Sequence, residues 1–346
     1  MKIETEERRQ MTARRIVVTG SVAYDYLMTF PGKFLDVVVP DRMDRLSVSF
    51  LVDSMRKVRG GVAPNIAYTL ALLGLKPVIM ATAGVDALDY SRWLAEQGVD
   101  TSSLHICDDL YTASFFVSTD QSQNQIATFY TGAMARAATL SFRDLSLSAV
   151  SIAVISPNDP DAMAKYAKEC RELHIPYVYD PSQQVARLSG SDLLAGLRGA
   201  ALLIANEYEF GVIEKKTGLS EAEMLEEVPA LIVTRGAEGS TIALRAGQPE
   251  APTAAATFRI PPARLRGPAV DPTGVGDAFR GGLLAARHHG LPWEVAGRVG
   301  SVSAVYTLEA LGPQPPRYAI ADFVDRYREN FGSEGPHARI RELLPR

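Results

Sequence analysis

The hydrophobic pattern of the second half of the chain is regular. After residue 150, short apolar runs of strand length alternate with polar clusters and with longer stretches of helical spacing. The strand-like runs span residues 152–155, 177–179, 202–205 and 231–233. Strand, polar cluster and helix in repeated order are typical of a parallel sheet with flanking helices. The pattern therefore predicts an α/β fold with one large, mostly parallel β-sheet that helices flank on both faces.

Further elements extend this pattern toward both ends of the chain. Continuous apolar runs predict buried strands, and apolar residues at helical spacing predict helices packed on one side. Strands are predicted at 16–20, 78–83 and 239–245, helices at 60–74 and 91–97, surface helices at 293–310 and 319–331, and irregular structure with an edge strand at 246–268.

A second group of strand-like segments suggests a smaller sheet. These segments lie at 34–39, 45–52, 112–119 and 125–130. Alternation of apolar and polar residues, clearest in the second of them, suits a sheet with one covered face. Residues 120–124 join the last two segments as a hairpin turn. We expect a small β-sheet lid, formed by about residues 24–58 and 108–132, on a single domain that spans 16–346.

Composition narrows the class of protein. Of the 346 residues, 47% are hydrophobic and 22% charged, and the net charge is −4. These values are typical of a globular protein without a nucleic-acid partner. No apolar run is long enough to cross a bilayer, and two cysteines are too few for a disulfide framework, so we expect a cytoplasmic protein with no membrane partner. The charged residues 1–15 are expected to be a disordered extension, with Met11 as an alternative start.

Residues 270–286 carry the strongest candidate chemistry. Gly274 and Gly276 flank Val275 in a short loop, and the spacing after Asp277 predicts a helix. A glycine loop that leads into a helix directs free N–H groups and the positive end of the helix dipole at one point, which attracts phosphate. A carboxylate in this first turn can accept a proton from a nearby hydroxyl. The loop lies too late in the chain for the dinucleotide-binding loop of a first βαβ unit.

Polar side chains follow almost every strand of the predicted sheet. Ligands of an open parallel sheet bind beyond the carboxyl ends of its strands, so these side chains should meet at one edge. The set comprises Ser21, Asp25, Asp86, Asn158, Asp180, Gln183, Gln184, Asn206, Glu209, Thr234 and Arg235. With the 274–277 loop at the same edge, the pattern predicts one elongated cleft with phosphate chemistry near Asp277.

Four ordered motifs resemble those of the PfkB, or ribokinase-like, family of sugar and nucleoside kinases. Residues 60–65, which read Gly-Gly-x3-Asn at a helix start, resemble its first signature, and residues 270–283 resemble its second. Residues 206–209 match its N-x-x-E motif, and residues 234–239 its T-x-G segment. The correspondence covers about residues 15–330, and its longer segments resemble bacterial adenosine kinases of actinobacterial type.

The resemblance implies an ATP-dependent kinase that phosphorylates the 5′-hydroxyl of a nucleoside, most closely adenosine. Asp277 would be the general base, and the N–H groups of residues 274–276 would stabilise charge on the transferring phosphoryl group. Pro272 and Val275 depart from the usual motif. Since a valine keeps its backbone N–H, we expect the anion site to remain.

The resemblance also implies which residues hold the nucleoside. Asp25 would bind two vicinal ribose hydroxyls, with support from Asn65 and the backbone of Gly61. Phe115 and Phe129, on the two arms of the hairpin, would stack on the base. Of the other candidates, Ser21, Ser49, Gln183 and Gln184 would contact the sugar and base edges, and Arg187 would neutralise the phosphate tail.

The phosphate donor is expected on the other side of the anion loop. Asn206, Thr234, Gly236 and Gly239 would line ATP. Glu209, together with Asn206, would hold Mg²⁺ through water, because that ion keeps several of its waters. A monovalent cation such as K⁺ would fit beside the anion loop. The exposed face of the small sheet also predicts a homodimer.

Three other functions stay open on the sequence. A sugar kinase of the ribokinase or fructokinase type would have the same fold but would need no aromatic shelf for a base. Inosine or guanosine would fit the same residues as adenosine. A non-catalytic nucleoside-binding regulator is the most distant alternative, because a base, an anion loop and a metal carboxylate are all present.

Overall fold

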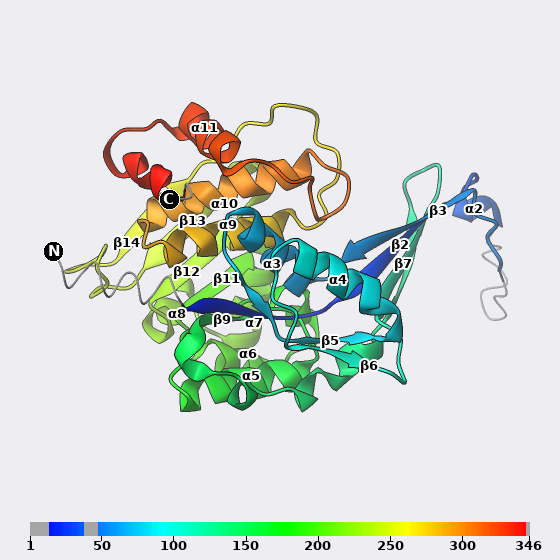
Figure 1. The fold of residues 1–346 in the computed structure, drawn as a ribbon, viewed down its shortest axis with the longest axis horizontal. Helices are drawn as coiled ribbons and strands as arrows, with labels where there is room; N and C mark the ends of the chain where they lie inside the picture. The colour runs from blue at the N-terminus through cyan, green and yellow to red at the C-terminus, as the bar shows by residue number, and fades with distance from the viewer. Residues whose placement is uncertain (1–13, 38–47, 344–346) are drawn as a thin grey trace.

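The core of the molecule is an eight-stranded sheet (Figure 1). The computed structural model describes residues 14–37 and 48–343. The strands are β1 (Arg15–Thr19), β4 (Val78–Ile79), β9 (Val150–Ile155), β10 (Tyr177–Tyr179), β11 (Leu202–Asn206), β12 (Ala230–Thr234), β13 (Ser240–Leu244) and β14 (Ala256–Ile260). Their order is β14-β13-β12-β11-β10-β9-β1-β4, and only the β12–β13 and β13–β14 pairs among these are antiparallel. This confirms the large, mostly parallel sheet.

Helices cover both faces of this sheet (Figure 1). One layer holds α3 (Val62–Leu72), α4 (Leu88–Glu96), α9 (Val275–His288), α10 (Trp293–Leu308) and α11 (Ile320–Phe331); the other holds α5 (Pro160–Glu172), α6 (Gly190–Leu197), α7 (Glu207–Thr217) and α8 (Glu221–Glu227). Along β1, Ile16 and Val18 belong to one core and Val17 to the other. Strands buried on both faces explain the continuous apolar runs.

The expectation that both C-terminal helices are surface helices is wrong for α10. Val295, Val299 and Val302 of this helix are fully buried. The helix packs against α9, and α11 lies outside it (Figure 1). At Gly300 a Cβ atom would lie 2.7 Å from the carbonyl oxygen of Phe279, so the two helices meet too closely for a side chain there. A helix that is apolar on most sides is buried between layers.

A four-stranded sheet extends from one end of the molecule (Figure 1). Its strands are β2 (Ala23–Thr29), β3 (Ser54–Gly60), β7 (Ala113–Thr119) and β8 (Gln125–Tyr130), in the order β3-β2-β7-β8. The predicted hairpin turn between β7 and β8 is confirmed. The Asp120 carboxylate accepts hydrogen bonds from the N–H groups of Ser122 at 2.8 Å and Asn124 at 2.9 Å.

Two of the predicted lid strands are wrong. Residues 34–37 form the short helix α2 (Phe34–Val37), and residues 48–52 have no regular structure. The remainder of both predictions, residues 38–47, lies outside the described residues. The rings of Phe30, Phe34 and Phe50 pack on one another at centroid distances of 4.8–5.3 Å. These apolar residues therefore form a small aromatic cluster instead of a strand. The edge of the small sheet is formed by the charged strand β3.

The predicted strand at 78–83 is divided. Its first part, β4, pairs with β1 in the large sheet, whereas β5 (Ala81–Gly84) pairs with β6 (Leu104–Cys107) in a separate two-stranded sheet. The remaining elements are 3₁₀ helices: η2 (Val85–Ala87), η3 (Gly132–Thr139), η4 (Phe142–Asp144), η5 (Leu147–Ala149), η6 (Ser182–Ala186), η7 (Gly236–Glu238) and η8 (Gly335–Leu343). Among the described helices, none has the length and apolar character that a bilayer crossing requires.

Candidate active site

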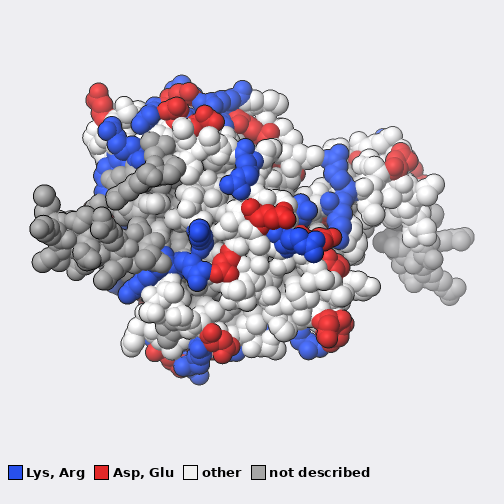
Figure 2. Space-filling view, viewed as in Figure 1, with Lys and Arg blue, Asp and Glu red and all other residues white. Residues whose placement is uncertain are grey.

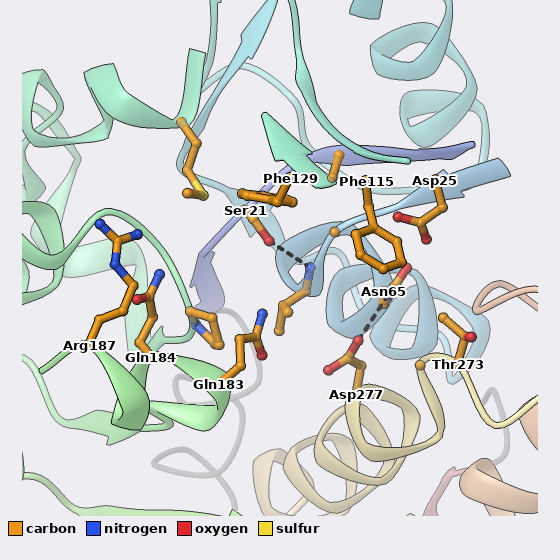
Figure 3. A pocket seen from close by; sticks show the side chains of 16 residues that line it. Ser21, Asp25, Asn65, Phe115, Phe129, Gln183, Gln184, Arg187, Thr273 and Asp277 are labelled. Atoms are coloured by element: carbon orange, nitrogen blue, oxygen red, sulfur yellow. Dashed lines mark hydrogen bonds between the residues drawn. The ribbon is translucent and has the colours of Figure 1, made fainter. Parts of the chain in front are cut away.

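A cavity of about 430 Å³ lies where the small sheet meets the carboxyl ends of β1 and β10 (Figure 3). It collects residues from six separate parts of the chain. The lining residues are Ser21, Ala23, Asp25, Gly61, Val62, Asn65, Phe115, Phe129, Met134, Pro157, Gln183, Gln184, Arg187, Thr273, Gly274 and Asp277. The topology thus brings the predicted nucleoside residues and the predicted base into one space, with the exception of Ser49, which is exposed and lies outside this lining.

The glycine loop before α9 has the geometry of an anion site. Gly274 is the N-cap of α9 in a left-handed conformation, with φ 75°. A Cβ atom on Gly274 would lie 2.4 Å from Cβ of Pro313. The N–H of Val275 donates only a long 3.4 Å hydrogen bond to Pro272, and N–H groups in the first helical turn have no partners within the helix. The loop therefore presents backbone donors at the positive end of the helix dipole.

Asp277 lies in the first turn of α9 and points into the cavity (Figure 3). Its Oδ2 accepts a 2.9 Å hydrogen bond from Nδ2 of Asn65 on α3. Burial raises the pKa of Asp277 to about 7, although Arg280 and the Asn65 hydrogen bond both act to lower it. A carboxyl with a pKa near the working pH is well matched to accept and release a proton.

A buried ion pair lies directly behind Asp277. Nη2 of Arg280 donates to Oδ1 of Asp180 at 2.7 Å, and Arg280 Nε lies 2.5 Å from the other oxygen. Burial raises the pKa of Asp180 to about 6, against the effect of Arg280. A Cβ atom on Gly276 would lie 2.7 Å from Nη1 of Arg280, so the second glycine of the loop makes room for the guanidinium. Sequence reasoning missed Arg280; its signal is a charged residue among the apolar positions of α9.

The two glycines of the first motif shape the opposite wall. A Cβ atom on Gly60 would lie 2.7 Å from Oδ2 of Asp25, and one on Gly61, where φ is 94°, would lie 2.5 Å from the carbonyl oxygen of Ser21. The Ser21 hydroxyl accepts a 3.3 Å hydrogen bond from the N–H of Val62. Burial, with a smaller contribution from Asp271, raises the pKa of Asp25 to about 6. The two glycines thus leave space for the carboxylate of Asp25, which is largely buried from water.

The aromatic wall is built by sheet register. Asp25 on β2 is paired with Phe115 on β7, and Phe115 is paired with Phe129 on β8. Residues in register on adjacent strands share one face of a sheet. All three line the cavity, and Phe129 is half-exposed. A carboxylate and two aromatic rings therefore lie in a row across the cavity.

The segment after β10 closes one end of the cavity. Gln184 is buried, and its Nε2 donates a 2.7 Å hydrogen bond to the backbone carbonyl of Asn158. Figure 3 places Arg187 beside Gln184, on the far side of the view from Asp277 and Thr273. A contact between Arg187 and the transferring phosphoryl group would therefore need movement of this segment.

The expected ATP residues lie outside the cavity, along the neighbouring strand ends. Asn206 closes β11 and is in register with Thr234, which closes β12. Gly236 and Gly239 follow in the turn into β13, both with positive φ. A Cβ atom on Gly239 would lie 2.1 Å from the carbonyl oxygen of Ile260, so this turn requires a glycine. These residues continue the carboxyl edge away from Asp277.

Glu209 fits a water-mediated role toward Mg²⁺. The described residues contain no group of three His, Cys, Asp or Glu side chains that would enclose a metal ion. Mg²⁺ in kinases is held by one or two carboxylates together with substrate phosphates and water. Both Glu209 oxygens already accept hydrogen bonds, from the N–H of Asn206 at 2.8 Å and the hydroxyl of Ser182 at 3.0 Å. Contact through water suits this donor set better than direct ligation.

A family model described as pfkB family carbohydrate kinase matches residues 14–319. The chain therefore belongs to the pfkB family and is a phosphotransferase with an alcohol acceptor. Two related sequences are nucleoside kinases of archaea. The enzyme of Methanocaldococcus jannaschii is 28% identical over 302 residues, 87% of this chain and 92% of its own length. The enzyme of Methanothermobacter thermautotrophicus is 28% identical over 331 residues, 93% and 98% of the two chains.

Solved structures agree with this assignment. Burkholderia thailandensis nucleoside kinase in complex with inosine superimposes with a TM-score of 0.79 at 34% identity, over 92% of this chain and 98% of that one. The nucleoside kinase of M. jannaschii, an archaeal member of the ribokinase family, gives a TM-score of 0.80 at 27% identity, over 92% and 99%. The ribokinase-like fold is thus confirmed. These relatives carry the broader name nucleoside kinase rather than the expected adenosine kinase of actinobacterial type.

Proposed function

We propose that this protein transfers a phosphoryl group from ATP to the 5′-hydroxyl of a purine nucleoside, with adenosine as the preferred substrate. The row of Asp25, Phe115 and Phe129 carries the proposal. Neighbouring strands lie about 4.8 Å apart, so the row spans about 10 Å, comparable to the length of a nucleoside. A ribose over the carboxylate would place its base against the two phenylalanine rings.

The proposed chemistry needs a hydroxyl between Asp277 and the glycine loop. Asp277 would orient the 5′-hydroxyl and take its proton as the new bond to phosphorus forms and the bond to the leaving ADP breaks. The N–H groups of Gly274, Val275 and Gly276 would stabilise the negative charge on the transferring phosphoryl group. Arg280 would keep the carboxylates of Asp180 and Asp277 from repelling each other.

ATP would bind along the carboxyl ends of β11 and β12, next to Asn206, Thr234, Gly236 and Gly239. Its γ-phosphate would then face the anion loop. Mg²⁺, when bound through Glu209 and water, supplies positive charge to the phosphates. A monovalent cation such as K⁺ near the anion loop stays part of the proposal.

One buried oxygen supports a polar contact with the ligand. Among the described residues, Oε1 of Gln184 is buried without a hydrogen-bond partner, while Nε2 is held by Asn158. A buried acceptor without a partner is costly, so a ligand N–H or O–H donor would stabilise it. An N–H of either adenine or hypoxanthine would serve. The B. thailandensis enzyme has been solved in complex with ADP and inosine, so inosine is the closest competitor to adenosine.

A sugar kinase is the second candidate. A 5-dehydro-2-deoxygluconokinase of Lacticaseibacillus casei is 25% identical over 283 residues, 74% of this chain. A free sugar would leave Phe115 and Phe129 without a stacking partner. The nucleoside proposal accounts for both rings, and the sugar proposal does not.

A panel of acceptors with ATP and Mg²⁺ tests the proposal. Adenosine, inosine, guanosine, ribose and fructose are compared by ADP release at equal concentrations. We expect the highest kcat/KM with adenosine, loss of turnover in Asp277→Asn with nucleoside binding kept, and a raised KM in Phe115→Ala. Robust ribose or fructose turnover without nucleoside turnover would contradict the proposal.

Lid closure and assembly complete the proposal. The small sheet, from about residues 24–58 and 108–132, would fold over the bound nucleoside and exclude water, which suppresses ATP hydrolysis.

We also propose a homodimer through this sheet. The free, buried Cys107 and Cys170 are in keeping with a reducing compartment, so we propose a cytoplasmic location.

A further inference from the structure

We propose that Gln314 and Tyr90, which lie outside the cavity lining, are positioning residues that hold the Asn65 amide with its N–H toward Asp277. This inference rests on the proposed role of Asp277 as the base. Gln314 belongs to the loop between α10 and α11, and Tyr90 belongs to α4. Neither residue was singled out by its sequence context.

A continuous chain of hydrogen bonds joins a backbone carbonyl to Asp277. The Tyr90 hydroxyl donates to the carbonyl oxygen of Gly60 at 3.0 Å. Nε2 of Gln314 contacts the Tyr90 hydroxyl at 2.6 Å and Oδ1 of Asn65 at 3.1 Å. Nδ2 of Asn65 then donates to Oδ2 of Asp277 at 2.9 Å. Five structural segments therefore meet in one line of hydrogen bonds.

The backbone carbonyl of Gly60 fixes the donor and the acceptor of every hydrogen bond in this series. A backbone carbonyl can only accept, so the Tyr90 hydroxyl uses its proton on Gly60 and offers a lone pair to Gln314. The Gln314 atom that faces Tyr90 must then be the amide nitrogen, whose second proton goes to Asn65. The Asn65 atom facing Gln314 is therefore oxygen, which leaves the Asn65 nitrogen for Asp277.

Without this chain, the Asn65 side chain would keep its contact with Asp277 but lose the one that fixes its oxygen. A flipped amide would place its oxygen against the Asp277 carboxylate, and the ionised form would lose a donor. Burial raises the pKa of Asp277, and the carboxylates of Asp180 and Glu209 act in the same direction, whereas Arg280 and the Asn65 hydrogen bond act to lower it. Loss of Gln314 or Tyr90 Oη should therefore raise the pKa of Asp277 further. Less of the enzyme would then hold the base in its ionised form at neutral pH.

The loop that carries Gln314 is itself tied to the anion site. Pro313 lies against Gly274, where a Cβ atom would be only 2.4 Å away. The N–H of Gly312 donates a 3.0 Å hydrogen bond to Oδ2 of Asp271. One loop thus supports both the glycine turn and the orientation of Asn65.

The test compares Gln314→Met and Tyr90→Phe with the wild type in the pH dependence of kcat/KM for the best nucleoside. We expect the acid limb to move up by about one pH unit in both variants, with about a tenfold loss near pH 6 that disappears by pH 9. In an Asn65→Ala background, Gln314→Met should cause no further shift, because the amide it orients is gone. A loss of equal size at every pH, or full additivity with Asn65→Ala, would overturn the proposal.

Matched controls separate orientation from packing. Gln248→Met makes the same substitution in a turn away from the cavity. Tyr166→Phe removes a buried hydroxyl that donates to the carbonyl of Ala137 in the opposite core. Neither should move the acid limb, and a shift in either would count against the proposal. If Gln314→Met fails to fold, Tyr90→Phe carries the same prediction.

A second readout does not depend on turnover. In protein with ¹³C-labelled aspartate, the Asp277 carboxyl signal, assigned with Asp277→Asn, should titrate about one unit higher in Gln314→Met than in the wild type. An unchanged titration overturns the inference even in an active kinase. An inactive wild type with the expected shift would instead contradict the proposed function alone.

Discussion

The buried carboxylate of Asp277 lowers the stability of the folded protein at neutral pH, where it must be ionised to act as a base. An aspartate in an unfolded chain has a pKa near 4, whereas burial raises that of Asp277 to about 7. Between these values the folded protein binds the proton and the unfolded chain does not. Stability from this group is therefore full below about pH 4, declines as the pH rises to about 7, and stays low above that.

Asp277→Asn should be more stable than the wild type at pH 8 and differ little from it near pH 3.5. We expect a gain of about 2 kcal/mol at pH 8, about half of what the shift in pKa implies, since the side chain is partly exposed. Urea denaturation at the two pH values measures the difference. A variant that is less stable than the wild type at pH 8 would refute the assignment of a strained carboxylate.

The kinetic counterpart lies in the acid limb of kcat/KM. Because Asp277 must be ionised to accept a proton, activity should rise through about pH 7 and then level off. Asp25, with a pKa raised to about 6, adds a second group on the same limb. A pH profile that stays flat between pH 5 and 8 would contradict the role of Asp277 as base.

Among these single substitutions, loss of Arg280 should lower the free energy of unfolding most. Arg280→Met leaves Asp180 buried without its partner, which costs about 3 kcal/mol in such pairs. The double variant with Asp180→Asn removes the uncompensated charge and should recover part of this loss. Chemical denaturation of the two variants checks the order. Equal stability of Arg280→Met and the wild type would show that the pair does not hold the site together.

At the scale of elements, the turn before α9 is the most constrained. Gly274 has φ 75° and contacts Pro313, whereas Gly218, the C-cap of α7, has φ 73° and space around it. Alanine at either position costs about 1 kcal/mol for the left-handed backbone. Only Gly274→Ala should also displace the anion loop, with a loss of kcat of about tenfold or more, because the donors must meet the transferring charge.

Gly218→Ala is therefore the matched control for this prediction. It should lower the melting temperature by a few degrees and leave kcat unchanged. Melting curves and steady-state kinetics on both variants give the comparison. A similar loss of kcat in the two would mean that strain alone, and not the position of the loop, accounts for the effect.

At the scale of the whole molecule, the two edges of the small sheet differ in charge. The edge strand β3 carries Arg56, Lys57 and Arg59, and Figure 2 shows basic side chains where the small sheet joins the large one. The other edge, β8, is uncharged and exposed along its length. Two copies of β3 would place like charges face to face, whereas two copies of β8 would not. We therefore expect the homodimer to form through β8.

Thr128→Lys tests this interface. Thr128 alternates with Phe129 along β8, so its side chain lies on the face away from the cavity. Light scattering after size exclusion should give twice the 37.5 kDa chain mass for the wild type and for Thr128→Val, and a single chain mass for Thr128→Lys. A monomeric wild type, or a dimer that persists in Thr128→Lys, would contradict the β8 interface.

The sequence predicted the elements that are buried on both faces and the motifs that surround the site. Continuous apolar runs such as 152–155 leave little choice of structure, and the longer motif around Gly274, Gly276 and Asp277, together with the other three motifs, points to phosphoryl transfer. The strands of the small sheet were harder to predict from the sequence, because β3 is a charged edge strand without alternation of apolar and polar residues. The apolar residues around Phe34 and Phe50 pack on each other instead.

Local pattern by itself therefore determined the layered α/β fold, the glycine loop and most of the residues that meet at the sheet edge. The prediction is wrong for Asp86, which follows β5 outside the large sheet and accepts hydrogen bonds from Thr112. Only the tertiary structure decided the Arg280–Asp180 pair, the in-register row of Asp25, Phe115 and Phe129, and the Gln314–Asn65 contact. These depend on strand register and on contacts between residues far apart in the chain, where burial changes the free energy of a charge or an amide. No short stretch of sequence contains that information.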